Sequence, residues 1–261
     1  MLKCCSLYSG SSGNSFLIQS NHTKLLIDAG VSCKKLETAL NDLNISPDEI
    51  QAVLVTHEHV DHTKGLPILS SKYNIPIYAN EKTWNHINSD KISDDNKRFF
   101  SNNTKFDISD LVISPFSTPH DAADPCGFNI YNDSKKISIA TDLGNINETI
   151  FNNLKSSSLI FLESNYDMNI LKYSHYPYRL KQRIASSFGH LENCTAGKTI
   201  AKLIDFGLKE AFLIHLSKEN NFPELANKTV WEELQKCNFS SDDICINVAP
   251  RDNTSKIAKV I

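Results

Sequence analysis

Two hydrophobic patterns alternate along this chain. Its first 30 residues contain short apolar runs separated by turn-forming residues, at Leu2 to Tyr8, Phe16 to Ile18 and Lys24 to Ile27. Runs of this length between Ser-, Gly- and Asn-rich segments predict antiparallel strands joined by tight turns. From Ser32 to Leu43 the apolar residues recur at helical spacing, and Ser32 is a suitable N-cap. The N-terminal part therefore predicts strand hairpins followed by a helix.

Strand-like and helix-like segments alternate over the rest of the chain. The apolar runs that predict buried strands are Ala52 to Val55, Ile75 to Tyr78, Leu111 to Phe116, Phe128 to Tyr131, Lys136 to Ala140, Leu159 to Leu162, Ala211 to Ile214 and Ile244 to Val248. The helical segments are Thr63 to Tyr73, Ile146 to Leu154, Arg179 to Phe188, Cys194 to Phe206 and Pro223 to Lys236. This order predicts an α/β (α+β) protein with a sheet-on-sheet core and outer helices, in one domain over residues 1–261.

The densest chemistry follows the predicted strand that ends at Val55. The segment Thr56-His57-Glu58-His59-Val60-Asp61-His62 places four possible metal ligands, His57, His59, Asp61 and His62, within six residues. An extended or tightly turned backbone can point His57 and His59 to one side, because they are two residues apart. Imidazole and carboxylate ligands together suit zinc, manganese or iron. A polar loop that contains several histidines is the alternative, but a position at a strand end favours a metal site.

Three further candidate ligands also follow predicted strands. Those strands end at Phe116, Ala140 and Ile214, and the candidates after them are His120, Asp142 and His215. Each one alone would more often be an ordinary hydrogen-bonded polar residue. Together with the histidine cluster they favour one site at the end of a sheet.

Composition adds only a few constraints. A net charge of -3 argues against nonspecific coating of nucleic acid, but bound divalent cations would supply positive charge in a nuclease site. The seven cysteines fit no metal or disulfide spacing and indicate reduced thiols. Neither a signal peptide nor an apolar stretch of roughly 20 residues is visible, so we expect a cytoplasmic protein that does not bind membranes.

Several longer sequence motifs accompany the histidine motif. They are Ser9-Gly10-Ser11-Ser12-Gly13-Asn14-Ser15, Thr118-Pro119-His120-Asp121-Ala122-Ala123-Asp124-Pro125, Leu162-Glu163-Ser164-Asn165, Gly189-His190-Leu191, His215-Leu216-Ser217-Lys218-Glu219-Asn220-Asn221 and Val248-Ala249-Pro250-Arg251. With them the chain resembles the metallo-β-lactamase superfamily over nearly its whole length. It is most similar to the WalJ/YycJ family of bacterial cytoplasmic hydrolases, regarded as DNA exonucleases. The resemblance implies an αββα sandwich, with two mixed β-sheets packed face to face and helices outside. The sequence departs from the family pattern at Val60, Tyr166, Glu192 and residues 143–145.

The resemblance also implies a centre with two divalent metal ions, which would be Zn, Mn or Fe. The implied ligands are His57, His59 and His120 for the first ion, Asp61, His62 and His215 for the second, and Asp142 as the bridge. Two ions roughly 3.5–4 Å apart would share a water molecule and lower its pKa toward about 7. The resulting metal-bridging hydroxide would be the nucleophile.

Residues around the ions have candidate roles in the reaction. Asp61 could orient the hydroxide as well as bind metal. The leaving oxygen needs a proton, and His190 is the candidate general acid, because nuclease branches of the superfamily also place a Gly-His pair before a helix. Glu163 could orient His190 from behind, and Asp28 could support the His57 loop by hydrogen bonding. The alternatives are a helix N-terminal position for His190 and a surface position for Glu163.

Basic and aromatic residues interleave between residues 172 and 183. Basic groups can bind phosphates and tyrosine rings can stack on unpaired bases. The candidate substrate contacts are Lys172, Tyr173, Tyr176, Arg179, Lys181 and Arg183. A solvated helix start with packing aromatics is the alternative. The turn from Ser9 to Ser15 could also offer amides to a phosphate, although a plain hairpin turn is the simpler interpretation.

These residues predict a dinuclear metal-dependent phosphodiesterase, and the resemblance favours a DNA exonuclease. An RNA-processing nuclease would use the same residues and is the first alternative. A small-molecule hydrolase acting on a thioester, a lactone or a cyclic phosphodiester is the second. A metal-binding module without catalysis is the third. The expected partner is a nucleic acid substrate, DNA.

Overall fold

The N-terminal hairpins are part of a mixed sheet of seven strands in the computed structural model, which describes residues 1–260. In spatial order these strands are β14 (Ala258–Val260), β1 (Leu2–Tyr8), β2 (Ser15–Gln19), β3 (Lys24–Ile27), β4 (Ala52–Leu54), β5 (Ile77–Asn80) and β6 (Lys97–Phe100). Strands β1 to β3 are antiparallel, as the turn residues between them predict. From β3 to β6 the neighbours are parallel, so β3, β4 and β5 end at the same edge.

A second mixed sheet of seven strands faces the first. Its spatial order is β13 (Cys245–Val248), β12 (Glu210–Ile214), β11 (Leu159–Glu163), β10 (Lys135–Ala140), β9 (Cys126–Asn132), β8 (Leu111–Ser117) and β7 (Phe106–Ile108). Strands β7 to β10 are antiparallel, whereas β10 to β13 are parallel. Strands β8, β10, β11 and β12 therefore all end at one edge of this sheet.

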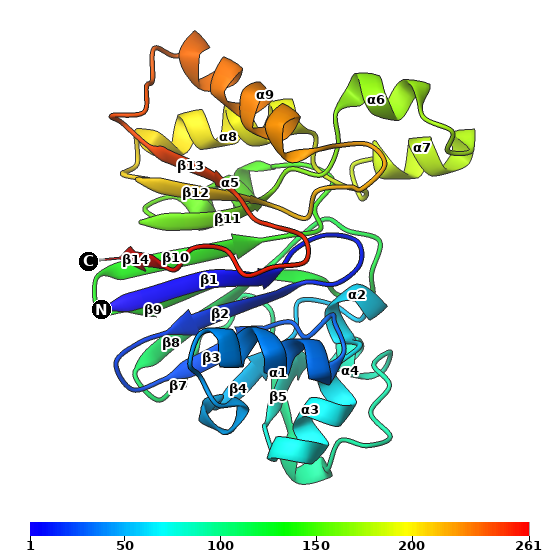
Figure 1. The fold of residues 1–261 in the computed structure, drawn as a ribbon, viewed down its shortest axis with the longest axis vertical. Helices are drawn as coiled ribbons and strands as arrows, with labels where there is room; N and C mark the ends of the chain where they lie inside the picture. Colours follow the sequence, from blue (N-terminus) through cyan, green and yellow to red (C-terminus); the bar gives the residue numbers. More distant parts are fainter. Residues whose placement is uncertain (261) are drawn as a thin grey trace.

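The helices cover the outer faces of the two sheets. Their bounds are α1 (Cys33–Asp42), α2 (Val60–Thr63), α3 (Leu66–Tyr73), α4 (Glu81–Trp84), α5 (Glu148–Leu154), α6 (Met168–Tyr173), α7 (Tyr178–Ile184), α8 (Asn193–Ile204) and α9 (Pro223–Lys236). Figure 1 shows α1 and α3 on one side and α8 and α9 on the other, while α6 and α7 project beside the sandwich. Among residues 1–260, no helix is both long and apolar enough to cross a membrane.

Three apolar layers hold the sandwich together. The central layer lies between the sheets and contains Phe16, Phe161 and Phe212, with ring centroids 5.3 Å apart for the first pair and 4.9 Å for the second. Two further layers join each sheet to its own helices. Because apolar side chains from both sheets share the central layer, the predicted αββα sandwich is confirmed.

Several local predictions are corrected by the structure. The helix predicted over Thr63 to Tyr73 begins only at Leu66, as α3, with Gly65 as its N-cap and Pro67 in its first turn, whereas Thr63 ends the short helix α2. The helix predicted to reach Phe188 ends at Ile184, where the carbonyl accepts from His190 N. Strands β6, β7 and β14 were not predicted, since each has only three or four residues and lies at or near a sheet edge.

Candidate metal centre

Parallel strand ends bring the candidate ligands together at one edge of the sandwich. The residues that close or follow these strands are Asp28 (β3), His57 (β4), His120 (β8), Asp142 (β10), Glu163 (β11) and His215 (β12). They come from both sheets. The edge is therefore formed only when the two sheets pack.

Three of these residues have left-handed backbone conformations. Asp28, Asp142 and His215 have φ values of 62°, 52° and 55°. This conformation turns the chain sharply after a strand, and it costs a non-glycine residue on the order of 1–3 kcal/mol. Strain of this kind persists where the surrounding structure imposes it, and such positions concentrate at functional sites. The three side chains are thereby turned into the edge rather than along the strand direction.

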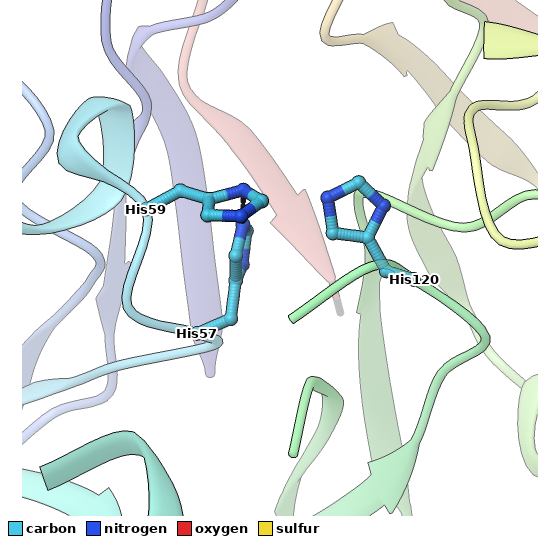
Figure 2. A group of neighbouring side chains, drawn as sticks. All are labelled: His57, His59 and His120. Atoms are coloured by element: carbon cyan, nitrogen blue, oxygen red, sulfur yellow. Dashed lines mark hydrogen bonds between the residues drawn. The ribbon is translucent and has the colours of Figure 1, made fainter. Parts of the chain in front are cut away.

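His57, His59 and His120 form the first group of candidate ligands. Figure 2 shows His57 and His59 on one loop with His120 facing them from another segment. His57 Nε2 lies 3.0 Å from His59 Nδ1, and the His120 ring centroid lies 5.1 Å and 5.2 Å from the other two. One ring nitrogen from each residue lies within 4.8 Å of the others, which is close enough to share one ion.

Asp61, His62 and His215 form a second group beside the first. His62 Nε2 and His215 Nε2 lie 3.6 Å and 3.5 Å from Asp61 Oδ2. Asp142 lies between the groups, because its carboxylate is 3.1 Å from His62 Nε2 and 3.7 Å from His120 Nε2. The structure thus brings together all seven residues predicted as ligands.

The hydrogen bonds around this cluster fit a metal ion. His120 Nδ1 donates to the Gly189 carbonyl at 2.9 Å, while its Nε2 is buried and has no hydrogen-bond partner among residues 1–260. His62 Nδ1 donates to Asp28 at 2.7 Å, and His215 Nδ1 to Glu163 at 2.8 Å. Bonds of this kind fix each ring with its other nitrogen directed inward, as histidine ligands of metals usually are.

The charges within the cluster favour ionised carboxylates. Although burial acts in the opposite direction, His215 and His62 hold the pKa of Asp142 well below its usual range. Burial lowers the pKa of His57 well below its ordinary value, so this imidazole stays neutral and can coordinate. Carboxylate oxygens and imidazole nitrogens, with no cysteine in the groups, are ligands suited to zinc, manganese or iron.

His190 and Glu163 lie directly beside the ligands. Glu163 is fully buried, and its Oε1 accepts from His190 Nδ1 and from His215 Nδ1, both at 2.8 Å. Burial alone would lower the pKa of His190, but the Glu163 carboxylate raises it above its ordinary value. The contact predicted between Glu163 and His190 is present, and Glu163 is not a surface residue. With Nδ1 bound to Glu163, His190 has Nε2 available to a substrate.

Asp28 is placed as predicted, but its contacts differ in detail. It accepts from Thr56 N and from Thr56 Oγ1, each at 2.8 Å, in addition to His62 Nδ1. Thr56 Oγ1 is in turn 3.0 Å from His57 Nδ1. Asp28 therefore positions His62 directly and His57 only through Thr56.

A cavity of about 170 Å³ opens beside His190 and is called the His190 cavity here. Its lining residues include Ser11, Asp121, Tyr176, Arg183, His190 and Ser217. The β1–β2 turn, the loop after β12 and helix α7 each supply part of its wall. The cavity thus gives access to the candidate general acid.

The predicted substrate contacts are distributed unevenly around this cavity. Tyr176 and Arg183 line it, and Tyr173 shares a second hollow of about 250 Å³ with Tyr176. The Lys181 ammonium donates to the carbonyls of Lys172 and Ser174 at 2.8 Å and 2.6 Å, which joins α7 to α6.

The other two predicted contacts lie apart from the cavity. Lys172 and Arg179 are exposed and line neither hollow. The basic residues therefore do not form one row toward the centre.

Some supporting residues had no predicted role. Asn14 is fully buried, with Nδ2 3.1 Å from His62 Nε2, and Ser9 Oγ accepts from His215 N at 2.8 Å. Gly30 packs so closely on the Asp61 carbonyl that a Cβ atom there would collide with it. Asn14 and Ser9 belong to the motif Ser9 to Ser15, which is part of the family resemblance. Residue spacing alone does not show which residues this turn contacts.

Two facing mixed sheets with a His/Asp cluster at their edge define the class of fold, and comparisons with known proteins agree. A family model described as a Beta-lactamase superfamily domain matches residues 23–216. The YhfI metallo-β-lactamase fold protein of Bacillus subtilis aligns with a TM-score of 0.74 at 18% identity, over 98% of this chain and 100% of that one. At that identity the likeness shows the fold alone.

Two relatives are similar over most of their length. The chain is 36% identical over 237 residues to exodeoxyribonuclease WalJ of Streptococcus pneumoniae, covering 89% of this chain and 88% of that protein. It is 37% identical over 235 residues to exodeoxyribonuclease YycJ of Bacillus anthracis, covering 89% of each. The chain therefore belongs to the metallo-β-lactamase superfamily and, within it, to the WalJ/YycJ family. The predicted resemblance is confirmed.

Proposed function

We propose that this protein is a metal-dependent phosphodiesterase that acts as a DNA exonuclease. The observation that carries the proposal is the placement of His190, backed by Glu163, between the ligand cluster and an open cavity. The similarity of this chain to two exodeoxyribonucleases, over most of each protein, supports DNA as the substrate. A nucleic acid is thus the proposed partner.

The proposed centre holds two divalent ions, which would be Zn, Mn or Fe. His57, His59 and His120 would hold the first, Asp61, His62 and His215 would hold the second, and Asp142 would bind both. When bound, the ions supply Lewis acidity toward the phosphate and lower the pKa of water.

The protein's own groups complete the reaction. Asp61 is partly exposed at the edge, so its carboxylate can accept a hydrogen bond from the attacking water. His190 can give an Nε2 proton to the oxygen that leaves phosphorus, because Glu163 accepts from its Nδ1 and favours the imidazolium form, which has a proton on both nitrogens. Hydrogen bonds between Asp28 and Thr56 hold the loop of His57 to His62 in place.

Two broader features support related proposals. All seven cysteines lie within the described residues and are free thiols, which supports a cytoplasmic location. Both sheets supply ligands, so we infer that residues 1–261 form one functional domain; Ile261 lies outside the described residues.

The test is hydrolysis by purified protein supplied with Mn²⁺ or Zn²⁺. End-labelled DNA and RNA are compared with a thioester and a cyclic nucleotide. We expect DNA to be shortened from its ends, a chelator to stop the reaction, and His59→Ala to abolish it. His86→Ala, at an exposed histidine outside the site, is the matched control and should keep full activity. Hydrolysis of RNA alone, or of the small substrates alone, would replace the proposal with one of the other functions considered above.

A further inference from the structure

The wall of the His190 cavity is anchored on several sides. Tyr176, Leu180 and Ile184 line it, and they pack with Leu171 and Tyr166 in a small apolar cluster of their own. His190 N donates to the Ile184 carbonyl at 2.9 Å, so the histidine and the end of α7 are joined directly. A DNA strand that reaches His190 therefore meets a packed wall on the side of α7.

A second contact joins this wall to the loop that contains the candidate ligand His120. Arg183 Nε donates to Asp121 Oδ2, and Asp121 directly follows the candidate ligand His120. This bond uses one of the five N–H donors of the guanidinium and fixes its orientation. The remaining donors are suited to a bidentate contact with a phosphate. Arg183 is the one lysine or arginine among the residues that line the cavity.

Hydroxyl donors lie around the same cavity. Ser217 Oγ accepts from Asn220 N at 3.2 Å and from Asn220 Nδ2 at 3.3 Å, so its own O–H can still be donated. Ser11 is exposed on the β1–β2 turn and also lines the cavity. Donors thus come from three separate segments. This arrangement fits an anion with several oxygens better than a flat base.

The size of the cavity limits what it can hold. A volume of about 170 Å³ has room for roughly half a dozen water-sized groups, since each takes about 30 Å³. That fits a phosphate group better than a whole nucleotide.

We propose that the His190 cavity binds the terminal phosphate of a DNA strand, with Arg183 as its principal contact. The inference rests on the proposed function and specifies how that function selects strand ends. The oxygen that receives the proton of His190 belongs to the terminal nucleotide, because that nucleotide lies on the cavity side of the scissile bond. This P–O bond breaks while the water oxygen bonds to phosphorus. The released nucleotide keeps its own phosphate, and the shortened strand acquires a new terminal phosphate.

Binding and hydrolysis are measured separately with the metal-loaded protein. Single-stranded oligodeoxynucleotides carry either a phosphate or a hydroxyl at one end, and each end is examined in turn. For binding, the probes have hydrolysis-resistant phosphorothioate linkages and a fluorophore at the opposite end. Charge-assisted hydrogen bonds to a phosphate predict roughly 10-fold to 100-fold tighter binding of the phosphorylated end, and a similar ratio of kcat/KM in hydrolysis.

Variants of α7 show whether Arg183 is responsible. Arg183→Ala should abolish the preference. Arg183→Gln should abolish it as well, although its amide can still donate to Asp121, and this separates the charge from the link to the loop. Arg179→Ala is the matched control, because Arg179 is an exposed arginine on the same helix outside the cavity, and it should keep the preference.

The outcomes separate this inference from the proposed function. Hydrolysis of DNA without any preference for a phosphorylated end, or with a preference that survives in both Arg183 variants, overturns the terminal-phosphate site and leaves the exonuclease intact. End-selective binding that depends on Arg183, without hydrolysis of DNA, supports the site and refutes the exonuclease. A wild-type protein that shows neither refutes both.

Discussion

Replacing Glu163 with glutamine exchanges one carboxylate oxygen for an NH₂ group at a residue that accepts four hydrogen bonds. Glu163 is fully buried, and both of its oxygens only accept hydrogen bonds. Oε1 accepts from the Nδ1 atoms of His190 and His215, and Oε2 accepts from Leu143 N at 2.9 Å and Leu191 N at 3.2 Å. Glutamine keeps one acceptor oxygen but introduces an NH₂ group at the other position. Two of the four donors must then face this NH₂ group.

The orientation of the new amide follows from what each pair of donors can do. A backbone N–H cannot change, and leaving two of them buried without acceptors costs roughly 2–6 kcal/mol, at about 1–3 kcal/mol each. An imidazole can instead move its proton to the other nitrogen. We therefore expect the Glu163→Gln oxygen to face the backbone and its NH₂ group to face the two imidazoles. His190 and His215 would then carry their protons on Nε2, which disables the inward nitrogen of His215 as a ligand.

The expected result is a folded protein with a damaged centre. Loss of an outer partner typically weakens metal binding about 10-fold to 100-fold, and a misplaced imidazole proton lowers kcat by up to about 10⁴-fold. Metal affinity is measured in chelator-buffered solution, tautomers by ¹⁵N NMR of the imidazoles, and folding by urea denaturation. Glu58→Gln is the control, because Glu58 Oε1 accepts only from Ala123 N at 2.7 Å, a bond that glutamine keeps. Normal metal affinity together with normal kcat in Glu163→Gln would refute the reasoning.

Three further variants test other parts of the structure. Asp142→Asn should reduce bound metal from two equivalents to one or fewer and abolish activity while the protein stays folded, as metal analysis and circular dichroism would show; two retained equivalents would exclude Asp142 as the shared ligand. His190→Ala should keep both ions yet lower kcat by roughly 10²–10⁴-fold, the usual effect of removing a general acid, whereas loss of an ion would make His190 a ligand. Burial lowers the pKa of Lys136 to about 8, and the unfolded value is about 10.4, so the unfolded chain binds more protons between these pH values. The free energy of unfolding should therefore rise relative to Lys136→Met as pH increases from 8 to 10.4, and denaturation that shows the opposite trend would contradict the assigned burial effect.

Local patterns were sufficient for the main elements and for the motif. Alternating apolar runs and turn residues predicted β1 to β3, because side-chain direction in a strand and the conformation of a tight turn depend on neighbouring residues. The spacing of His57, His59, Asp61 and His62 likewise predicted a metal-binding loop. His120, Asp142 and His215 could be predicted as partners because parallel strands end at a common edge.

Short elements at sheet edges could not be predicted in this way. Strand β14 has three residues and forms only by pairing with β1 at the opposite end of the chain. Strand β6 pairs with β5 at the edge of the first sheet, and β7 pairs with β8 at the edge of the second. The partners of β14 and β6 are distant in sequence, whereas β7 pairs with the adjacent β8, and all three strands are too short to give a clear local hydrophobic signal.

The roles of individual side chains at the site also depended on tertiary packing. Arg179 and Arg183 lie one turn apart on α7 and look equivalent in the sequence, but only Arg183 reaches Asp121 and the cavity. The sequence assigned Glu163 one partner, His190, whereas the segments after β10, before α8 and after β12 together give it four donors. Residue type determined which groups could bind metal or transfer a proton. The docking of the two sheets and of α7 determined which of them meet, because contacts such as Asp121 with Arg183 and Asp61 with His215 join segments 62 and 154 residues apart and leave no local pattern.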